Sequence, residues 1–394
     1  MRVWMSIVPG HGHFFPMVPL ARALERAGHE VTFCTSESYA ETVVDHGFAA
    51  LGVGLDYTQG GARGEATEPE HVDSVVAHKM FVEAPPLILD DLLVRFETER
   101  PDVMLFDPWE RGGIVAAEAA SIPFGAVVNA IRTGLLLGRL PFDQGERMRM
   151  IQERLVQPEQ DLRRRAGLDE HGRLLGESAF DRTLVLDMVP TSLAPWPRQW
   201  ASHVWHPLRP ETHESGGDHD WVDSLEGPVV SISLGTLFGN PGLYERVTRA
   251  ALDVGASVVA VTRFDLGIEH DALTQVSWAS MDRLLPKTDV FVHHGGWGST
   301  ISGLASGTPA VVLPLGSDQF NNAARLASVG GGLTVDHRRI EADLTTAIGK
   351  ALEDPVYRLN AQRIGAEIAA MPGPDDVVPL VERLASDGLA LRSD

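Results

Sequence analysis

Short apolar segments alternate with longer amphipathic segments along most of the chain. Four short segments in the first half are typical of buried β-strands: Val3–Val8, Val31–Thr35, Val103–Phe106 and Phe124–Val128. Between the first two, Pro16–Ala27 carries apolar residues at helical spacing and is followed by Gly28, which suits a helix C-terminus. Because this alternation is typical of a parallel sheet covered by helices, we predict a Rossmann-like first domain.

The same alternation begins again in the second half of the chain. Its strand-like segments are Val229–Leu234, Ser257–Val261, Val290–His293, Ala310–Leu313 and Leu333–Val335. Before them, proline, glycine and polar residues cluster without periodicity, as they do in linkers. A chain of 394 residues is also too long for one ordinary hydrophobic core. We therefore predict an α/β protein with two Rossmann-like domains.

These segments also predict the domain bounds. Residues 1–207 form the N-terminal domain, 208–226 a linker and 227–372 the C-terminal domain. Residues 373–394 form a helix that packs toward the N-terminal domain. The stretch 132–175 mixes apolar residues with Arg, Gln and Glu, and we interpret it as helical excursions above the first sheet.

The charge of the chain limits its partners. It has 54 acidic and 33 basic residues, and its formal net charge of -21 repels phosphate backbones and anionic lipid surfaces. No apolar stretch approaches the roughly 18 residues needed to cross a bilayer. The first ten residues lack the long apolar centre of a signal peptide, and Cys34 is the single cysteine. We expect a cytoplasmic protein without nucleic-acid or membrane partners.

A glycine-rich segment at 293–300 has the features of an anion-binding turn. Its sequence is His293-His294-Gly295-Gly296-Trp297-Gly298-Ser299-Thr300, directly after a predicted buried strand. Glycines let a ligand approach the backbone, and the N–H groups at a helix start can face that ligand. From the local sequence alone, a plain strand-to-helix turn is the alternative.

A carboxylate and an amide follow the next predicted strand. Asp318 and Gln319 come after Ala310–Leu313, and ligands bind at the carboxyl ends of parallel strands. Such a pair suits the vicinal hydroxyls of a sugar, which require both donors and acceptors. Taken alone, the two residues are also compatible with a simple helix start.

With these motifs the sequence resembles glycosyltransferase family 1, and more closely its bacterial members that modify macrolides, aromatic polyketides, enediynes and glycopeptides. The resemblance spans nearly the whole chain. It also includes Gly-x-Pro and Asp-Gln-x-x-Asn-Ala up to Ala323, Ser233-Leu234-Gly235-Thr236, and Gly12-His13-Phe14-Phe15-Pro16. It implies a GT-B fold, in which the two Rossmann-like domains face each other across a cleft. It also implies an inverting, metal-independent transfer of a sugar from a nucleoside diphosphate to a small apolar acceptor, with no further cofactor.

The resemblance assigns the donor nucleotide to the second domain. The residues that it implies for the base, diphosphate and sugar are Ser233, Thr236, Trp278, Ala279, His294, Gly296, Gly298, Ser299, Thr300, Asp318 and Gln319. Trp278 would stack on the base, and a buried core tryptophan is its alternative role. Many uridine-nucleotide users carry a glutamate for the ribose where this chain has Ser302, which fits a thymidine nucleotide better.

Two residues of the first domain are candidates for catalysis. His13 follows the first strand, and a neutral imidazole can take an acceptor proton near pH 7. Asp107 ends the strand Val103–Phe106 and would rise at the same sheet edge, where a carboxylate fixes the histidine tautomer. The resemblance assigns the same pair. His11 is the alternative base, a loop-capping role is the alternative for Asp107, and Asp102 should lie at the opposite edge.

Other functions have weaker support. Asp218-His219-Asp220 matches a metal-binding Asp-x-Asp string, but it lies in the predicted linker, and we interpret it as a solvated charge cluster without a metal. Gly10–Phe15 lacks the third glycine of a dinucleotide fingerprint. A nucleotide-sugar 2-epimerase of the same fold and a non-catalytic partner of another transferase remain alternatives. The acceptor, the sugar and the subunit count, a homodimer included, stay open.

Overall fold

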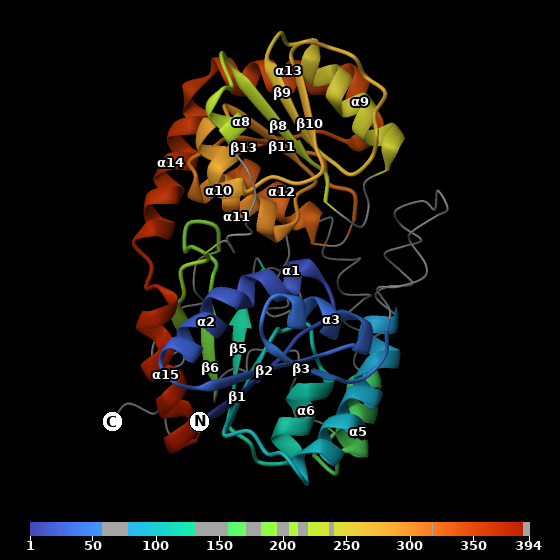
Figure 1. Cartoon of the computed structure of the whole chain (residues 1–394), viewed down its shortest axis with the longest axis vertical. Coiled ribbons are helices and arrows are strands. Elements are labelled where there is room, and N and C mark those ends of the chain that lie inside the picture. The colour runs from blue at the N-terminus through green and yellow to red at the C-terminus, as the bar shows by residue number, and fades with distance from the viewer. Residues whose placement is uncertain are drawn as a thin grey trace. The chain divides into compact units, whose positions relative to one another are not determined.

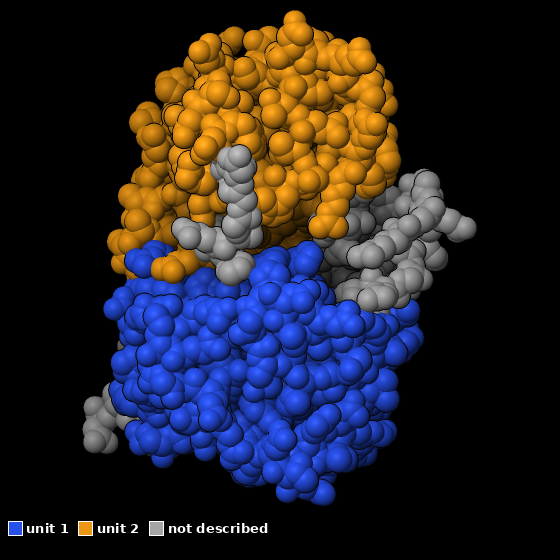
Figure 2. Space-filling model, in the orientation of Figure 1, with its two compact units in different colours: residues 1–65, 71–209, 372–394 blue, residues 66–70, 210–371 orange. Residues whose placement is uncertain are grey.

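The computed structural model describes residues 1–56, 78–130, 157–170, 183–194, 205–211, 220–235, 240–316 and 318–388. Their contacts divide them into two compact units (Figure 2). Unit 1 contains the described residues up to Arg209 and those from Pro372 onward, and unit 2 contains those from Pro210 to Met371. The predicted α/β class is confirmed in both units, each of which has a parallel sheet.

Unit 1 is built on a parallel sheet with the strand order β3-β2-β1-β4-β5-β6-β7 (Figure 1). Its strands are β1 Arg2–Ser6, β2 Glu30–Thr35, β3 Ala49–Gly52, β4 Val103–Phe106, β5 Phe124–Val128, β6 Leu184–Asp187 and β7 Trp205–Pro207. The strands pair in register, with Met5 beside Phe33 on one side and beside Leu105 on the other. Central strand β4 is wholly apolar and buried, and β1 is buried from Val3 to Ser6, because both faces of these strands are covered.

The helices of unit 1 lie on both faces of this sheet. They are α1 His11–Phe14, α2 Val18–Arg26, α3 Glu37–Asp45, α5 Ala84–Phe96, α6 Gly112–Ala119 and α15 Pro374–Asp387, with short helical turns at Phe15–Met17 and Lys79–Glu83. On one face, Leu89 and Leu92 of α5 pack with Val115 of α6 against Met104 and Phe106.

The structure changes the predicted start of the first helix. Helical geometry begins at His11 instead of Pro16, because the N–H groups of His13 and Phe14 both donate to the carbonyl of Gly10. The C-terminus is as predicted: α2 ends before Gly28, which has a φ of +86° and donates to the carbonyl of Glu25. His13 therefore lies in a first helical turn and not in an open loop.

Unit 2 repeats the plan with the strand order β10-β9-β8-β11-β12-β13, again parallel. Its strands are β8 Val229–Ser233, β9 Ser257–Val261, β10 Leu273–Val276, β11 Val290–His293, β12 Ala310–Val312 and β13 Gly332–Thr334. Its helices are α8 Asp220–Asp223, α9 Pro241–Leu252, α10 Met281–Leu284, α11 Trp297–Ala305, α12 Gln319–Ser328, α13 Ile340–Glu353 and α14 Pro355–Ala369.

Alternate residues of the central strand β8 enter two different cores. Val230 and Ile232 belong to a large apolar cluster with residues of α9 and α13, whereas Val229 packs with Ala279 and Leu284. Two helices of this unit begin at a capping residue followed by proline. The side chain of Asn240 accepts from the Leu243 N–H at 2.9 Å at the start of α9.

Several elements follow the prediction only in part. The short strands β3, β6, β7 and β10 were not predicted, and β3, β7 and β10 lie at or next to sheet ends. Residues 157–165 of the stretch 132–175 are helical, whereas 132–156 and 171–175 lie outside the described residues. The predicted linker 208–226 contains α8 and the buried Leu208. Within the described residues, no helix combines the length and apolar composition that spanning a bilayer requires.

Candidate active site

Each sheet has one point at which the chain stops adding strands on one side and continues on the other side. In unit 1 this point lies between β1 and β4, and in unit 2 it lies between β8 and β11. Ligands of open parallel sheets bind beside such points, outside the carboxyl ends of the strands. His13 follows β1 and Asp107 follows β4, while Ser233 ends β8 and His294 follows β11. These four predicted site residues thus lie at the two switch points.

His13 and Asp107 form a contact pair in unit 1. Nδ1 of His13 faces Oδ2 of Asp107; the carboxylate is fully buried and the imidazole side chain is 27% exposed. The other carboxylate oxygen, Oδ1, accepts from the N–H of Trp109 at 3.0 Å. A carboxylate against Nδ1 keeps the proton of the neutral imidazole on that nitrogen, so Nε2 is the basic nitrogen. The structure therefore brings the two predicted residues together.

The neighbouring candidates take other roles. Nδ1 of His11 lies 2.9 Å from the hydroxyl of Tyr39, and its ring stacks on Phe15. Tyr39 is largely buried, and burial raises the pKa of its hydroxyl. Asp102 lies at the start of β4, where its carboxylate accepts from the N–H of Arg2 at 2.7 Å, as predicted for the opposite edge. We retain His13 as the candidate base.

In unit 2 the ring of His294 is enclosed by two glycines. A Cβ atom at Gly235 would lie 2.7 Å from Nε2 of His294, and one at Gly296 would lie 2.5 Å from it. Such distances are far inside van der Waals contact, so any larger residue would displace the ring. Gly235 and Gly295 also have φ values of +74° and +89°, which favour glycine.

Helix α11 begins directly beside this ring. Its first residue is Trp297, and Gly296 at the N-cap supplies no side-chain cap. Thr300 in the first turn is 2% exposed, and its hydroxyl oxygen has no hydrogen-bond partner among the described residues. Uncapped N–H groups, a helix dipole and a buried hydroxyl are the components of an anion site.

The two histidines at this turn are uncharged near neutral pH. Burial and, to a smaller extent, the neighbouring His294 lower the pKa of His293 to about 3. Burial also lowers the pKa of His294 to about 4, against the opposing effect of a hydrogen bond with the Ser233 backbone. His294 is half-buried, and the packing of its ring between two glycines favours the uncharged form. The turn therefore offers neutral hydrogen-bonding groups and a helix dipole to an anion, not a formal cation.

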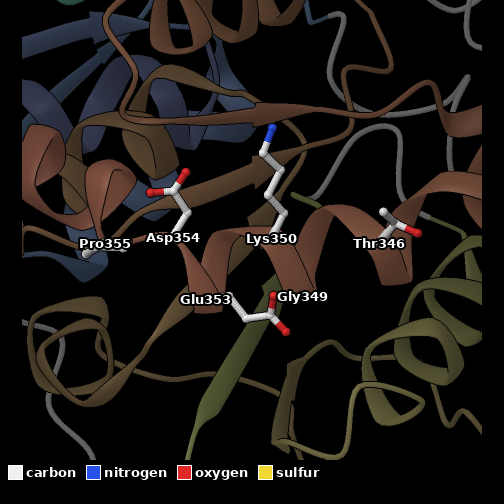
Figure 3. A pocket seen from close by; sticks show the side chains of 6 residues that line it. All are labelled: Thr346, Gly349, Lys350, Glu353, Asp354 and Pro355. Atoms are coloured by element: carbon white, nitrogen blue, oxygen red, sulfur yellow. The ribbon is translucent and has the colours of Figure 1, made fainter.

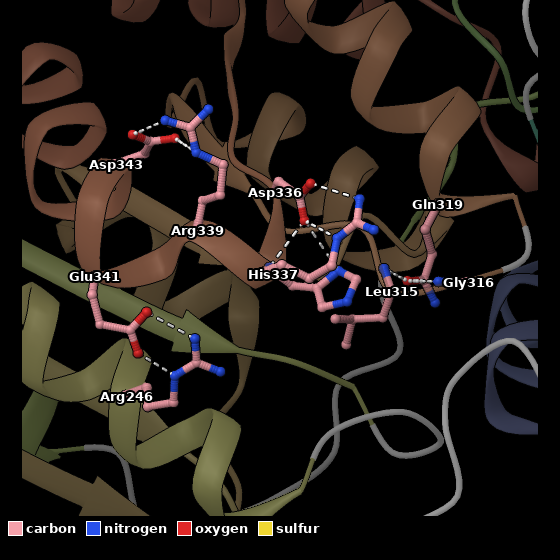
Figure 4. A network of polar contacts seen from close by, with 10 residues as sticks. Arg246, Leu315, Gly316, Gln319, Asp336, His337, Arg339, Glu341 and Asp343 are labelled. Carbon is pink, nitrogen blue, oxygen red and sulfur yellow. Dashed lines mark hydrogen bonds and ion pairs between the residues drawn. The ribbon is translucent and has the colours of Figure 1, made fainter.

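The carboxylate and amide after β12 are held by their own turn. Oε1 of Gln319 accepts from the N–H groups of Leu315 at 2.8 Å and Gly316 at 3.1 Å (Figure 4). The amide of Asn322 donates to Oδ2 of Asp318 at 3.0 Å and to the carbonyl of Gly295 at 2.8 Å. Since Oε1 of Gln319 is used in this way, its NH₂ group is the part that can serve a ligand.

Asn322 was not among the predicted site residues. It is 1% exposed and connects the turn after β12 with the turn after β11. The Asp-Gln-x-x-Asn spacing contained the signal, because residues four apart lie on one side of a helix. His293 and Tyr39 were also missed, since nothing in a single sequence distinguishes a core residue from one that borders a site.

The remaining predicted donor residues are placed as follows. Trp278 is 41% exposed, which argues against the buried-core alternative. Ala279 beside it is buried, and Ser302 is buried on α11. Gly298 is exposed and Ser299 half-buried at the start of α11. Thr236 lies outside the described residues.

A surface pocket of about 630 Å³ occurs elsewhere in unit 2. Residues from the end of α13 and the start of α14 line it, among them Lys350, Glu353 and Asp354 (Figure 3). It contains none of the predicted site residues. Within the part of the chain that the structure describes, no group of three or more His, Cys, Asp or Glu side chains could hold a metal ion.

Comparisons with known proteins agree with these features. The family described as the C-terminal domain of erythromycin biosynthesis protein CIII-like proteins matches residues 245–384. The L-demethylnoviosyl transferase of Streptomyces niveus is 29% identical, over 95% of this chain and 96% of the relative. The resemblance to GT-B glycosyltransferases of natural-product biosynthesis is confirmed.

Solved structures of GT-B glycosyltransferases are similar in fold to this chain. Glycosyltransferase VinC in complex with dTDP has a TM-score of 0.75 and 24% identity, over 98% of this chain and 100% of that one. The Streptomyces sp. SF2575 glycosyltransferase SsfS6 complexed with thymidine diphosphate has a TM-score of 0.74 and 24% identity, over 97% and 99%. The relatives are antibiotic sugar transferases, and these two structures carry a thymidine nucleotide.

Proposed function

We propose that the chain is an inverting glycosyltransferase that moves a sugar from a thymidine diphosphate donor to a hydroxyl of a small apolar natural product. The single observation that carries the proposal is the buried Asp107 against Nδ1 of His13 at the switch point of unit 1. A nucleotide-binding protein without acceptor chemistry does not need this pair. The antibiotic sugar transferases among the relatives support the substrate class.

His13 would act as the base. Nε2 takes the proton from the acceptor hydroxyl while that oxygen forms a bond to the anomeric carbon of the sugar. Asp107 keeps the proton of the neutral imidazole on Nδ1 and stabilises the imidazolium as it forms. The bond from the anomeric carbon to the diphosphate oxygen breaks on the opposite face, which inverts the configuration.

The turn after β11 would hold the leaving diphosphate. The N–H groups at the start of α11 and the Thr300 hydroxyl can donate to its oxygens, and the ring of His294 would lie beside them. We propose that no metal ion is required, because these donors and the helix dipole can stabilise the developing negative charge. Asp318 and the NH₂ group of Gln319 would bind the sugar hydroxyls.

The proposed base can be tested with TDP-glucose as donor and a panel of macrolide and aromatic aglycones as acceptors. We expect His13→Ala to lower kcat by about 100-fold or more, the usual scale for losing a general base. Thymidine diphosphate affinity should stay within about twofold of the wild type, because His13 belongs to unit 1. Asp107→Asn should cause a smaller loss of turnover.

The matched control is Asp102→Asn, which removes a carboxylate from the other end of β4. It should retain wild-type turnover, and every rate should be the same in excess chelator. Full turnover of His13→Ala would contradict the proposed base, and turnover abolished by chelator but restored by magnesium would contradict the metal-free reaction. Donor conversion that does not depend on any acceptor would indicate an epimerase.

The donor nucleotide can be tested separately by calorimetry. A glutamate that bonds the ribose hydroxyls is absent, and the shorter side chain of Ser302 is buried in α11. We expect thymidine diphosphate to bind at least as tightly as uridine diphosphate, although it has one hydroxyl fewer. Tenfold tighter binding of uridine diphosphate, about 1.4 kcal/mol, would contradict the thymidine assignment and leave the transferase proposal in place.

A further inference from the structure

A second buried carboxylate lies three residues after Asp107. Glu110 is 3% exposed and belongs to the loop between β4 and α6, and none of the steps above uses it. Glutamate is almost never fully buried without partners, because leaving water costs the charged form several kcal/mol or more. The contacts of Glu110 therefore indicate its role in the fold.

Glu110 connects the loop to both elements beside it. Its Oε2 accepts from the hydroxyl of Ser6 in β1 at 2.8 Å and from the N–H of Gly113 in α6 at 3.0 Å. Its own N–H donates to the carbonyl of Asp107 at 2.9 Å. The N–H of Asp107 in turn donates to the carbonyl of Ser6 at 3.1 Å. Ser6, Asp107 and Glu110 thus form one connected set of bonds.

The glycines after Glu110 leave room for this arrangement. A Cβ atom at Gly113 would overlap Oε2 of Glu110 and lie 3.0 Å from the hydroxyl of Ser6. A Cβ atom at Gly112 would lie 2.5 Å from the carbonyl of Pro85. Helix α6 can therefore begin directly against the loop only because its first two residues are glycine.

We propose that Glu110 is a positioning residue for the catalytic pair, which holds the loop 107–113 so that Asp107 stays directed at His13. This inference rests on the proposed function. Glu110 does not reach the substrate in this assignment; it acts through Asp107, because its carboxylate fixes the loop that carries Asp107 to Ser6 of β1 and to Gly113 of α6.

The electrostatics of the loop agree with a role based on hydrogen bonds. Burial raises the pKa of Glu110 to about 7; bonds from Gly113, Ser6 and Gly112 oppose this shift, and the charge of Asp107 adds to it. Among the described residues, Arg111 and the Cys34 thiol also interact electrostatically with this cluster, as does His13 through Asp107. A neutral carboxyl still accepts hydrogen bonds, so the loop is held whether or not Glu110 is ionised.

The test measures kcat with TDP-glucose and the aglycone panel, together with thymidine diphosphate affinity. We expect Glu110→Ala to lower kcat by about 10-fold or more, because small misplacements of a catalytic group have effects of that order. Thymidine diphosphate affinity should be unchanged. Glu110→Gln, which keeps the acceptor oxygen, should restore kcat to within about threefold of the wild type.

A second background separates positioning from a general structural role. In Asp107→Ala, the further change Glu110→Ala should alter kcat by less than about twofold, since the group through which Glu110 acts is already absent. A structural role would lower kcat by the same factor in both backgrounds. If Glu110→Ala does not fold, the same test uses Ser6→Ala, which removes one hydroxyl. Ser6→Ala should lower kcat several-fold in the wild type and should leave kcat unchanged in the Asp107→Ala background.

Wild-type turnover in Glu110→Ala, or equal losses in the two backgrounds, would overturn the inference. Equal losses in Glu110→Ala and Glu110→Gln would also overturn it, because the glutamine keeps the bonds. These results leave the proposed function in place. A wild-type chain that transfers no sugar, or a fully active His13→Ala, would instead contradict the proposed function itself.

Discussion

At the scale of single residues, the contacts of each side chain set its chemistry. Asp107 uses one oxygen for the N–H of Trp109 and presents the other to His13. His293 shows the opposite case, since it is fully buried, its ring stacks on Phe291, and Nδ1 accepts from the N–H of Gly295 at 3.0 Å. A histidine buried in this way is neutral when unfolded histidines are already protonated.

The free energy of unfolding of unit 2 should therefore depend on pH through His293. Its folded pKa of about 3 lies below the ordinary 6.5, so the unfolded state takes up a proton first as the pH falls. The stability is fully present above about pH 6.5 and is lost as the pH falls toward 3. The loss at pH 5 should be about 2 kcal/mol, at up to about 1.4 kcal/mol per pH unit.

Urea unfolding between pH 8 and pH 5 measures this effect. His293→Gln cannot take up a proton at this position. Between pH 8 and pH 5 its free energy of unfolding should therefore fall by about 2 kcal/mol less than that of the wild type. The exposed His270→Gln is the matched control. Identical pH dependence in the wild type and His293→Gln would show that His293 does not contribute.

At the scale of elements, the turns that begin α6 and α11 depend on close approaches that glycine permits. The turn after β11 is the sharper example, because Gly296 has ordinary extended dihedral angles and is needed only for space. Its neighbour Gly295 is needed for its positive φ. Glycine is thus required at these two adjacent positions for different physical reasons.

Gly296→Ala should displace the His294 ring and weaken thymidine diphosphate binding by about 10-fold or more, because a Cβ atom at 2.5 Å from Nε2 cannot be accommodated. Calorimetry measures this change. The control is Gly349→Ala on α13, where a Cβ atom meets nothing within 4 Å. It should bind the nucleotide normally and gain about 0.5–1 kcal/mol of stability. Wild-type affinity in Gly296→Ala would remove His294 from the donor site.

At the scale of the whole molecule, the last helix belongs to the first unit. Helix α15 packs on α2 and on β4, β5 and β6, although all of unit 2 separates them in the sequence. The residues that it buries are Pro374, Val377, Val378, Val381 and Leu384. The exposed ion pair between Arg26 and Asp375 adds little, because water screens it.

Leu384→Ala should lower the free energy of unfolding of unit 1 by about 2–5 kcal/mol, the usual cost of such a cavity. Thymidine diphosphate affinity should not change, because the donor residues belong to unit 2. Leu359→Ala on α14 is the control, since its side chain is 63% exposed. Thermal unfolding that is unaffected by Leu384→Ala would contradict the packing of α15 on unit 1.

The strands with continuous apolar runs could be predicted from the sequence. The predicted bounds of β4, β5, β9 and β11 agree with the structure, because these strands are buried on both faces. Strand β10, Leu273–Val276, could not be predicted in the same way, since it is half exposed at a sheet edge and carries threonine and glutamine. The glycine turn at 293–300 could also be predicted from the sequence. The conformation of a turn and of the helix start that follows it depends on residues that are neighbours along the chain.

By itself, the sequence determined the long buried strands, where the glycine turns lie and which residues follow those strands, because these properties depend on neighbours along the chain. Only the tertiary structure decided the strand order, which makes β1 the neighbour of β4 and β8 the neighbour of β11. That order brings His13 to Asp107, the ring of His294 between Gly235 and Gly296, and Glu110 to Ser6. The physical reason is that burial selects the sheet order through contacts between residues up to about a hundred positions apart. A local sequence pattern does not determine those contacts.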